Sequence, residues 1–147
     1  MKAHDEDIYN FIIGRTSLLV NRILLRTFRK HDLDLTMEQW SILEILWKKD
    51  GCTQQELGQR TFREKAGITR LLDKLEEQNL IVRVPDRIDR RVRFVYLTAK
   101  GKSIEEISTA IVKETYEHAI GNIGEEEMAV CKKVLNQVYQ NLHDAEI

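Results

Sequence analysis

Apolar residues recur at helical spacing between Lys65 and Ile81. Four of them stand at relative positions zero, three, four and seven: Ile68, Leu71, Leu72 and Leu75. This spacing places their side chains in one stripe on an α-helix. The opposite face carries mostly polar residues: Ala66, Arg70, Asp73 and Glu77. The pattern therefore predicts an amphipathic helix with one buried stripe and one exposed polar face.

Two short runs of β-branched and aromatic residues follow this helix, at Ile81–Val84 and Phe94–Leu97. The segment between them begins with Pro85 and is rich in aspartate and arginine, which suits a turn and not a strand interior. We therefore expect a β-hairpin with a basic tip. A helix followed by such a hairpin has the outline of a winged helix.

The chain before this region predicts three helices. Apolar residues form a band wider than one stripe over residues 5–31, which predicts a long helix that needs cover on more than one side, here from a second subunit. Thr36 has the spacing of a capping box and opens a helix through Lys49. Thr53 has the same spacing and opens a short helix, which makes a helix-turn-helix with the helix that begins near Lys65.

Two helices are expected after the hairpin. Thr98 can cap a helix that continues through about Ile120, and glycines at 121 and 124 separate it from a final helix that begins near Glu125. The final helix has apolar residues at steps of three, four, three and four, the spacing of a coiled-coil seam. The seam residues are Met128, Cys131, Leu135, Val138 and Leu142.

We interpret this seam, together with Ile12 and Leu19 of the first helix, as a dimer interface; ordinary core packing is the alternative. The expected fold is mostly α with a small β-hairpin wing, a winged helix-turn-helix with N- and C-terminal dimerisation helices. It is one domain over 1–147, with the winged helix at about 36–98 and the dimerisation helices at about 5–31 and 99–144.

Positive charge is concentrated in the winged-helix region. The whole chain has 23 basic and 24 acidic residues and a formal net charge of −1. The segment Arg60–Arg93 has ten basic and six acidic residues, a local balance of +4, which leaves −5 for the remainder. Such an uneven distribution is typical of a phosphate-binding surface. An ordinary solvated face is the alternative, but the arginines of 87–93 lie in a turn, without a helical carboxylate partner four residues away.

No motif of an enzyme is present, and no cofactor or metal is expected. Glu114 and His118 lie one helical turn apart, which fits an ordinary surface pair better than a metal site. Cys52 and Cys131 fall in different expected elements and are interpreted as free thiols. No apolar run approaches the ~20 residues needed to span a bilayer. Because the N-terminus also lacks a signal pattern, we expect a cytoplasmic protein with no membrane contact.

Four aromatic residues in the first two helices have two interpretations. They could line an effector pocket between these helices and a dimer partner, or they could be core residues, which is the commoner role of buried aromatics. The four residues are Tyr9, Phe28, Trp40 and Trp47.

The segment Asp89–Thr98 matches the DxRxxxVxLT wing signature of MarR-type transcriptional regulators, and Ala99-Lys-Gly101 continues it. The segment Ile68–Leu75 resembles the recognition helix of that family, and the order of helices along the whole chain also fits. Asn79 departs from the usual glycine, and Arg63-Glu64 replaces a capping residue. The resemblance implies an obligate homodimer that binds a palindromic operator in double-stranded DNA as a repressor, often released by a small aromatic or phenolic effector.

On this interpretation, the expected helix lies in the major groove, where Thr69 and Arg70 are candidates for base edges or nearby phosphates. Lys65 and Lys74 flank the helix and would bind phosphates. Ala66 and Gly67 complete its DNA-facing set. Gly67 would allow either close packing on the preceding helix or close approach to the DNA backbone.

In the wing, the resemblance assigns Arg91 to the minor groove, with Asp89 orienting its guanidinium through a charge-assisted hydrogen bond. Arg87 and Arg90 would add backbone contacts. A winged helix used for protein–protein contact is the alternative function, but it would not need ten basic residues in the helix and wing.

Overall fold

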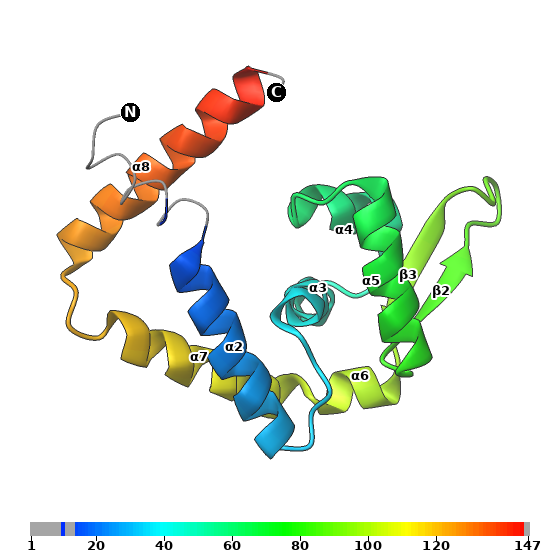
Figure 1. Cartoon of the computed structure of the whole chain (residues 1–147). Helices are drawn as coiled ribbons and strands as arrows, with labels where there is room; N and C mark the ends of the chain where they lie inside the picture. The colour runs from blue at the N-terminus through cyan, green and yellow to red at the C-terminus, as the bar shows by residue number, and fades with distance from the viewer. Residues whose placement is uncertain (1–9, 11–13, 146–147) are drawn as a thin grey trace. The chain divides into compact units, whose positions relative to one another are not determined.

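The structure is a computed structural model that describes residue 10 and residues 14–145. The chain forms two compact units, Met1–Lys113 and Glu114–Ile147. Figure 1 shows the elements of both units. The first unit contains α2 (Arg15–Lys30), α3 (Met37–Lys48), β1 (Cys52–Thr53), α4 (Gln54–Arg60), α5 (Lys65–Glu77), β2 (Ile81–Pro85), β3 (Arg93–Leu97), α6 (Ala99–Ser103) and the part of α7 (Glu105–Ile120) up to Lys113. The second contains the rest of α7 and α8 (Glu125–Asp144). The expectation of a mostly helical chain with a small β-hairpin is confirmed.

The three strands form one antiparallel sheet in the order β1-β3-β2. In the hairpin, Ile81 pairs with Leu97 and Pro85 pairs with Arg93. Pro85 is tolerated there because it stands at the end of an edge strand. The third strand, β1, was not expected from the sequence, since two residues are too few to show a strand periodicity.

The hydrophobic core of the first unit is built from one face of each helix and from the sheet. The apolar stripe predicted for α5 is buried as expected at Ile68, Leu72 and Leu75, while Leu71 is half-buried. Burial of each such side chain stabilises the fold by about 1.5–3 kcal/mol. Fully buried partners come from four other elements: Leu24, Phe28, Ile42, Leu43, Leu46, Leu57 and Val95. This core fixes α5 so that its polar face is directed outward.

Helix ends follow the capping signals of the sequence. Thr36 and Gln39 form a reciprocal capping box, with N···O distances of 3.2 and 3.0 Å. The Thr53 hydroxyl accepts a hydrogen bond from the Glu56 amide at 3.1 Å. Asn79, which follows α5, adopts φ 59°, a left-handed conformation that asparagine tolerates in place of the usual glycine.

The expected continuous helix over 5–31 is wrong. In the structure α2 begins at Arg15 behind Gly14, which adopts φ 101°. Glycine reaches this left-handed region without a Cβ penalty, and the apolar periodicity on either side does not reveal the break. Tyr9 and Ile12 lie outside the described residues.

The expected continuous helix over 98–120 is also interrupted, at Ile104. The Ile104 amide bonds to the Lys102 carbonyl instead of continuing the α-helical pattern, and Ile104 ends α6 with φ −94° and ψ 0°.

In the second unit, α8 begins after Gly124 as expected. The glutamates at 125–127 occupy its first turn, where negative charge is favourable to the helix dipole. No residue of α8, all of which is described, is buried within the single chain. Among the described residues, no helix is long and apolar enough to cross a membrane.

Candidate nucleic-acid interface

The exposed face of α5 carries the side chains that the sequence assigns to DNA. Lys65, Ala66, Arg70 and Lys74 are exposed, while Gly67 and Thr69 are half-buried. The helix begins after Glu64, whose side chain makes no capping hydrogen bond, as its sequence indicates. Three cations along an exposed helix face suit contacts with phosphates and base edges.

The hydroxyl group of Thr69 is already hydrogen-bonded within the chain. It donates to the Lys65 carbonyl oxygen at 2.7 Å and accepts from Gln54 Nε2 at 2.8 Å. Because its proton is committed, Thr69 in this arrangement offers a base only a remaining lone pair and a methyl group. Gln54, at the start of α4, is a residue that sequence reasoning missed, since nothing in a local pattern joins it to a side chain fifteen positions away.

Asp89 holds Arg91 at the tip of the wing. Asp89 Oδ1 accepts from the Arg91 amide at 3.0 Å and from Arg91 Nε at 3.1 Å. The same hydrogen bonds lower the pKa of the Asp89 carboxyl group, so this group stays ionised well into acid. The Arg91 side chain is 92% exposed. Its guanidinium is therefore oriented by a carboxylate yet open to a ligand.

The turn between the strands is closed by its own backbone. The Asp86 amide donates to the Val92 carbonyl at 2.8 Å, and the Val92 amide donates to the Asp89 carbonyl at 3.0 Å. The Asp89 amide bonds in turn to Asp86 Oδ2 at 3.2 Å. Arg87 and Arg90 are exposed on this closed turn. The basic tip is thus a defined loop.

Arg83 of β2 joins the wing to α5. Its guanidinium Nη2 lies 2.6 Å from Asp73 Oδ1 and 3.1 Å from Glu76 Oε1, and only 9% of the side chain is exposed. The hydrogen bond from Arg83 lowers the pKa of Glu76, and the same bond raises the pKa of Arg83. Sequence reasoning missed this residue. The strand alternation places Arg83 on the same face as buried Ile81, and that signal could have found it.

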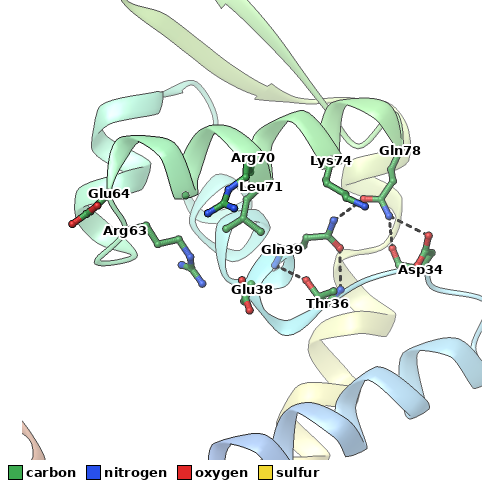
Figure 2. A pocket seen from close by; sticks show the side chains of 11 residues that line it. Asp34, Thr36, Glu38, Gln39, Arg63, Glu64, Arg70, Leu71, Lys74 and Gln78 are labelled. Atoms are coloured by element: carbon green, nitrogen blue, oxygen red, sulfur yellow. Dashed lines mark hydrogen bonds between the residues drawn. The ribbon is translucent and has the colours of Figure 1, made fainter. Parts of the chain in front are cut away.

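Two grooves lie beside α5. One, of about 820 Å³, is lined by α4, α5 and the wing, and includes Lys65, Thr69 and Arg91. The other, of about 590 Å³, lies between α5 and the start of α3 and includes Arg70 and Lys74. Figure 2 shows Arg70 and Leu71 pointing from α5 toward the start of α3. The predicted DNA-facing residues are thus divided between the two grooves, with Lys65, Thr69 and Arg91 lining one and Arg70 and Lys74 lining the other.

Comparison with known proteins identifies the family of this chain. A sequence profile of the MarR family matches residues 35–92. The HTH-type transcriptional regulator MhqR of Bacillus subtilis is 28% identical over 130 residues, which cover 88% of each chain. The transcriptional regulator HosA of Escherichia coli is 30% identical over 112 residues, which cover 73% of this chain and 83% of HosA. The chain belongs to the MarR family of transcriptional regulators. These relatives are regulators, in agreement with the expectation that the chain is not an enzyme.

Solved structures of MarR-family proteins have the same fold. A MarR protein from Peptoclostridium difficile superposes with a TM-score of 0.82 at 23% identity, covering 99% of this chain and 93% of the other. The MepR–DNA complex of Staphylococcus aureus superposes with a TM-score of 0.79 at 26% identity, covering 91% of this chain and 97% of MepR. These similarities confirm the winged-helix fold that the sequence predicts for this chain.

In this MarR-family chain, the aromatic residues proposed for an effector pocket are largely packed. Phe28 and Trp40 belong to the buried core, and Trp47 packs edge-on against Trp40 with ring centroids 6.3 Å apart. The Trp47 Nε1 group donates to the Gly101 carbonyl oxygen at 2.9 Å. Trp40 Nε1 is buried and has no hydrogen-bond partner among the described residues. The two grooves beside α5 are lined by other residues. The pocket stays a prediction, and Tyr9 lies outside the described part of the chain.

The residues predicted for a dimer interface lie open in the single chain. Cys131, Leu135 and Leu142 are exposed on α8, and Met128 and Val138 are half-buried. Leu19 on α2 is 52% exposed. Ile12 lies outside the described residues. Their role as an interface is not decided by one chain and stays a prediction.

Gly67 is not required for packing on the preceding helix. Apart from its chain neighbours and the backbone of its own helix, a Cβ at this position would meet no atom of the described residues within 4 Å, so the close-packing interpretation is wrong. Glycine inside a helix costs ~1 kcal/mol relative to alanine. We expect Gly67→Ala to raise the free energy of unfolding by about 1 kcal/mol in a urea titration. Gly58→Ala in α4 is the matched control, because its Cβ would lie 3.2 Å from the Arg63 carbonyl oxygen and bring no such gain.

Proposed function

We propose that this MarR-family regulator is a homodimeric repressor that binds a palindromic operator through α5 and the wing and is released by a small aromatic or phenolic effector. The observation that carries the proposal is the Asp89–Arg91 pair, an exposed guanidinium oriented by a carboxylate at the tip of a closed hairpin. Such a group suits the narrow minor groove, where negative potential is enhanced.

The exposed face of α5 would lie in the major groove. Arg70 and Thr69 stand at its centre and would contact base edges, while Lys65 and Lys74 would bind phosphates on either side. Ala66 and Gly67 have no bulk, so the helix backbone can come close to the DNA there. MepR, which is 26% identical to this chain, has been solved as a complex with DNA, and this supports DNA as the partner.

Dimerisation would supply the second half-site. One recognition helix makes few base contacts, and a two-fold dimer doubles them at half-sites about 34 Å apart. The seam on α8 supports this proposal, because its apolar side chains are open in the single chain. Leu135 and Leu142 alone are 53% and 56% exposed.

An aromatic effector would bind beside the Trp40–Trp47 pair. The indole N–H of Trp40 has no partner among the described residues, and a buried donor without an acceptor is costly. A phenolic oxygen would supply that acceptor, while its ring would pack against the Trp40–Trp47 pair.

Replacement of Arg91 by alanine tests the wing. We expect it to weaken operator binding by about 1–3 kcal/mol, with a smaller loss for Asp89→Ala, which leaves the guanidinium present but unpositioned. Fluorescence anisotropy on a duplex selected by the wild-type protein from a random library measures both. Lys132→Ala on α8 removes the same charge away from the wing and should bind like the wild type.

Two outcomes separate the parts of the proposal. Equal binding by the wild type and Arg91→Ala at moderate salt would refute the role of the wing. Substitutions at Thr69 and Arg70 should instead change which duplexes are selected. Gly67→Ala should combine its gain in stability with weaker operator binding, because the added methyl group faces the DNA.

A further inference from the structure

The tip of the wing carries one large apolar side chain that the protein does not use for packing. Ile88 is 96% exposed, the highest value among the large hydrophobic residues of the described chain. Single exposed apolar residues are common on protein surfaces and by themselves mean little. Ile88 differs in its setting, because it stands next to Arg87 and two positions before Arg90, within the basic loop that joins β2 to β3.

The loop presents Ile88 in a fixed position. The hydrogen bonds that close the turn join Asp86 to Val92 and Asp89 to Asp86, and Ile88 lies between these anchored positions. Isoleucine is β-branched, so its χ1 angle is restricted before any contact is made. The entropic cost of ordering this side chain against a partner is therefore small.

The arginines that surround Ile88 limit what that partner can be. A loop with Arg87, Arg90 and Arg91 exposed is attracted to a polyanion and not to an apolar protein surface. The minor groove of DNA combines both properties, since phosphates line its rims and the deoxyribose rings of its walls are largely apolar. Apolar side chains inserted there contact sugars and base edges and open the groove.

We infer that Ile88 is an apolar contact residue of the wing, which packs into the minor groove of the operator against the deoxyribose rings beside the site of Arg91. The inference rests on the proposed operator binding and adds a contact of a different kind. Arg91 supplies charge, and its contribution falls with salt. Ile88 supplies burial of apolar surface, and its contribution does not depend on counterion release.

Ile88→Ala separates these two contributions. The variant should fold with unchanged stability, since the side chain contacts solvent in the free protein. It should bind the selected operator about tenfold more weakly, because it removes three carbon atoms that are partly buried in the complex. The slope of log affinity against log salt should stay that of the wild type, whereas Arg91→Ala should reduce the slope by about one per wing. Ile88→Val should keep most of the affinity.

Hydroxyl-radical footprinting gives a readout that a purely structural role would not change. The radicals attack deoxyribose from the minor groove, so Ile88→Ala should expose sugars at the outer edge of each half-site that the wild type protects. Val84→Ala is the matched control: Val84 is 45% exposed on the same hairpin, away from the tip, and its substitution should leave affinity and footprint unchanged.

Each contrary outcome is distinct. If Ile88→Ala matches the wild type in affinity and footprint while Arg91→Ala loses affinity, the inference fails and the operator-binding proposal stands. If Val84→Ala weakens binding as much as Ile88→Ala, the tip has no special contact and the inference fails. If the wild type selects no duplex at all, the operator-binding proposal fails first.

Discussion

Replacement of Gly101 by alanine is expected to destabilise the first unit by about 3 kcal/mol or more. A Cβ at this position would stand 2.1 Å from the Leu80 carbonyl oxygen and 3.2 Å from Leu97 Cδ2. The closest atom belongs to the backbone of Leu80, immediately before β2, so a change of rotamer cannot relieve the overlap. The glycine that continues the wing signature is therefore explained by the close approach of α6 to the hairpin.

The hydrogen bonds of Gly101 increase the loss of stability that we expect for Gly101→Ala. Its carbonyl oxygen accepts the indole hydrogen bond of Trp47, and its amide donates to the Thr98 hydroxyl at 3.0 Å. A shift of α6 that accommodates a methyl group would stretch both. Urea denaturation measures the loss, and Gly67→Ala is the control, since the same chemical change in an open helix position should have the opposite sign. Equal stability of Gly101→Ala and the wild type would contradict the packing of α6.

Replacement of Leu135 and Val138 together by aspartate is expected to abolish the dimer and with it operator binding. Unpaired carboxylates buried in an apolar interface would cost several kcal/mol. Leu135 is 53% exposed and Val138 half-buried in the single chain, so the variant should keep its helical content as a monomer. Sedimentation velocity, far-UV circular dichroism and operator binding measure the three properties on one preparation.

The matched control places the same two charges on the other face of α8. Gln137→Asp with Gln140→Asp adds two carboxylates to exposed positions roughly opposite the seam and should leave both dimer and affinity intact. A folded Leu135→Asp, Val138→Asp monomer that binds the operator with wild-type affinity would refute the requirement for a dimer. A persistent dimer would instead move the interface away from the seam.

The sequence predicted those parts of the fold that a local pattern determines. The stripe of α5, the two strands of the hairpin and the capping box at Thr36 all follow from spacing within a few residues, and each was placed within about one residue of its observed bounds. The breaks at Gly14 and Ile104 were missed because the apolar periodicity continues across them. Neither the positive φ of Gly14 nor the turn at Ile104 changes that periodicity.

In the candidate site too, local features were predicted from the sequence and contacts between elements were not. The two-residue spacing of Asp89 and Arg91 is local. The family resemblance predicts that Asp89 orients the Arg91 guanidinium, and the structure has the hydrogen bond that does so. Gln54 and Arg83 act through partners that the fold brings from other elements. The strand alternation could have placed Arg83 on the buried face of β2, but its partners on α5, like the Gln54–Thr69 pair, follow only from knowledge of which faces meet.

The ion pairs of Arg83 have a consequence for the engineering of new DNA specificities. A chimera that receives only the α5 helix of another regulator would lose Asp73 and Glu76 and leave a guanidinium that is 9% exposed without its counter-charges. The hairpin would then no longer be held at its angle to the grafted helix. Because the pKa of Glu76 is lowered below its ordinary value of 4.5, the pairing holds at neutral pH and is lost only as the pH falls through that lowered pKa. A transplanted DNA-binding region should therefore include β2 with α5, so that helix and wing are exchanged as one module.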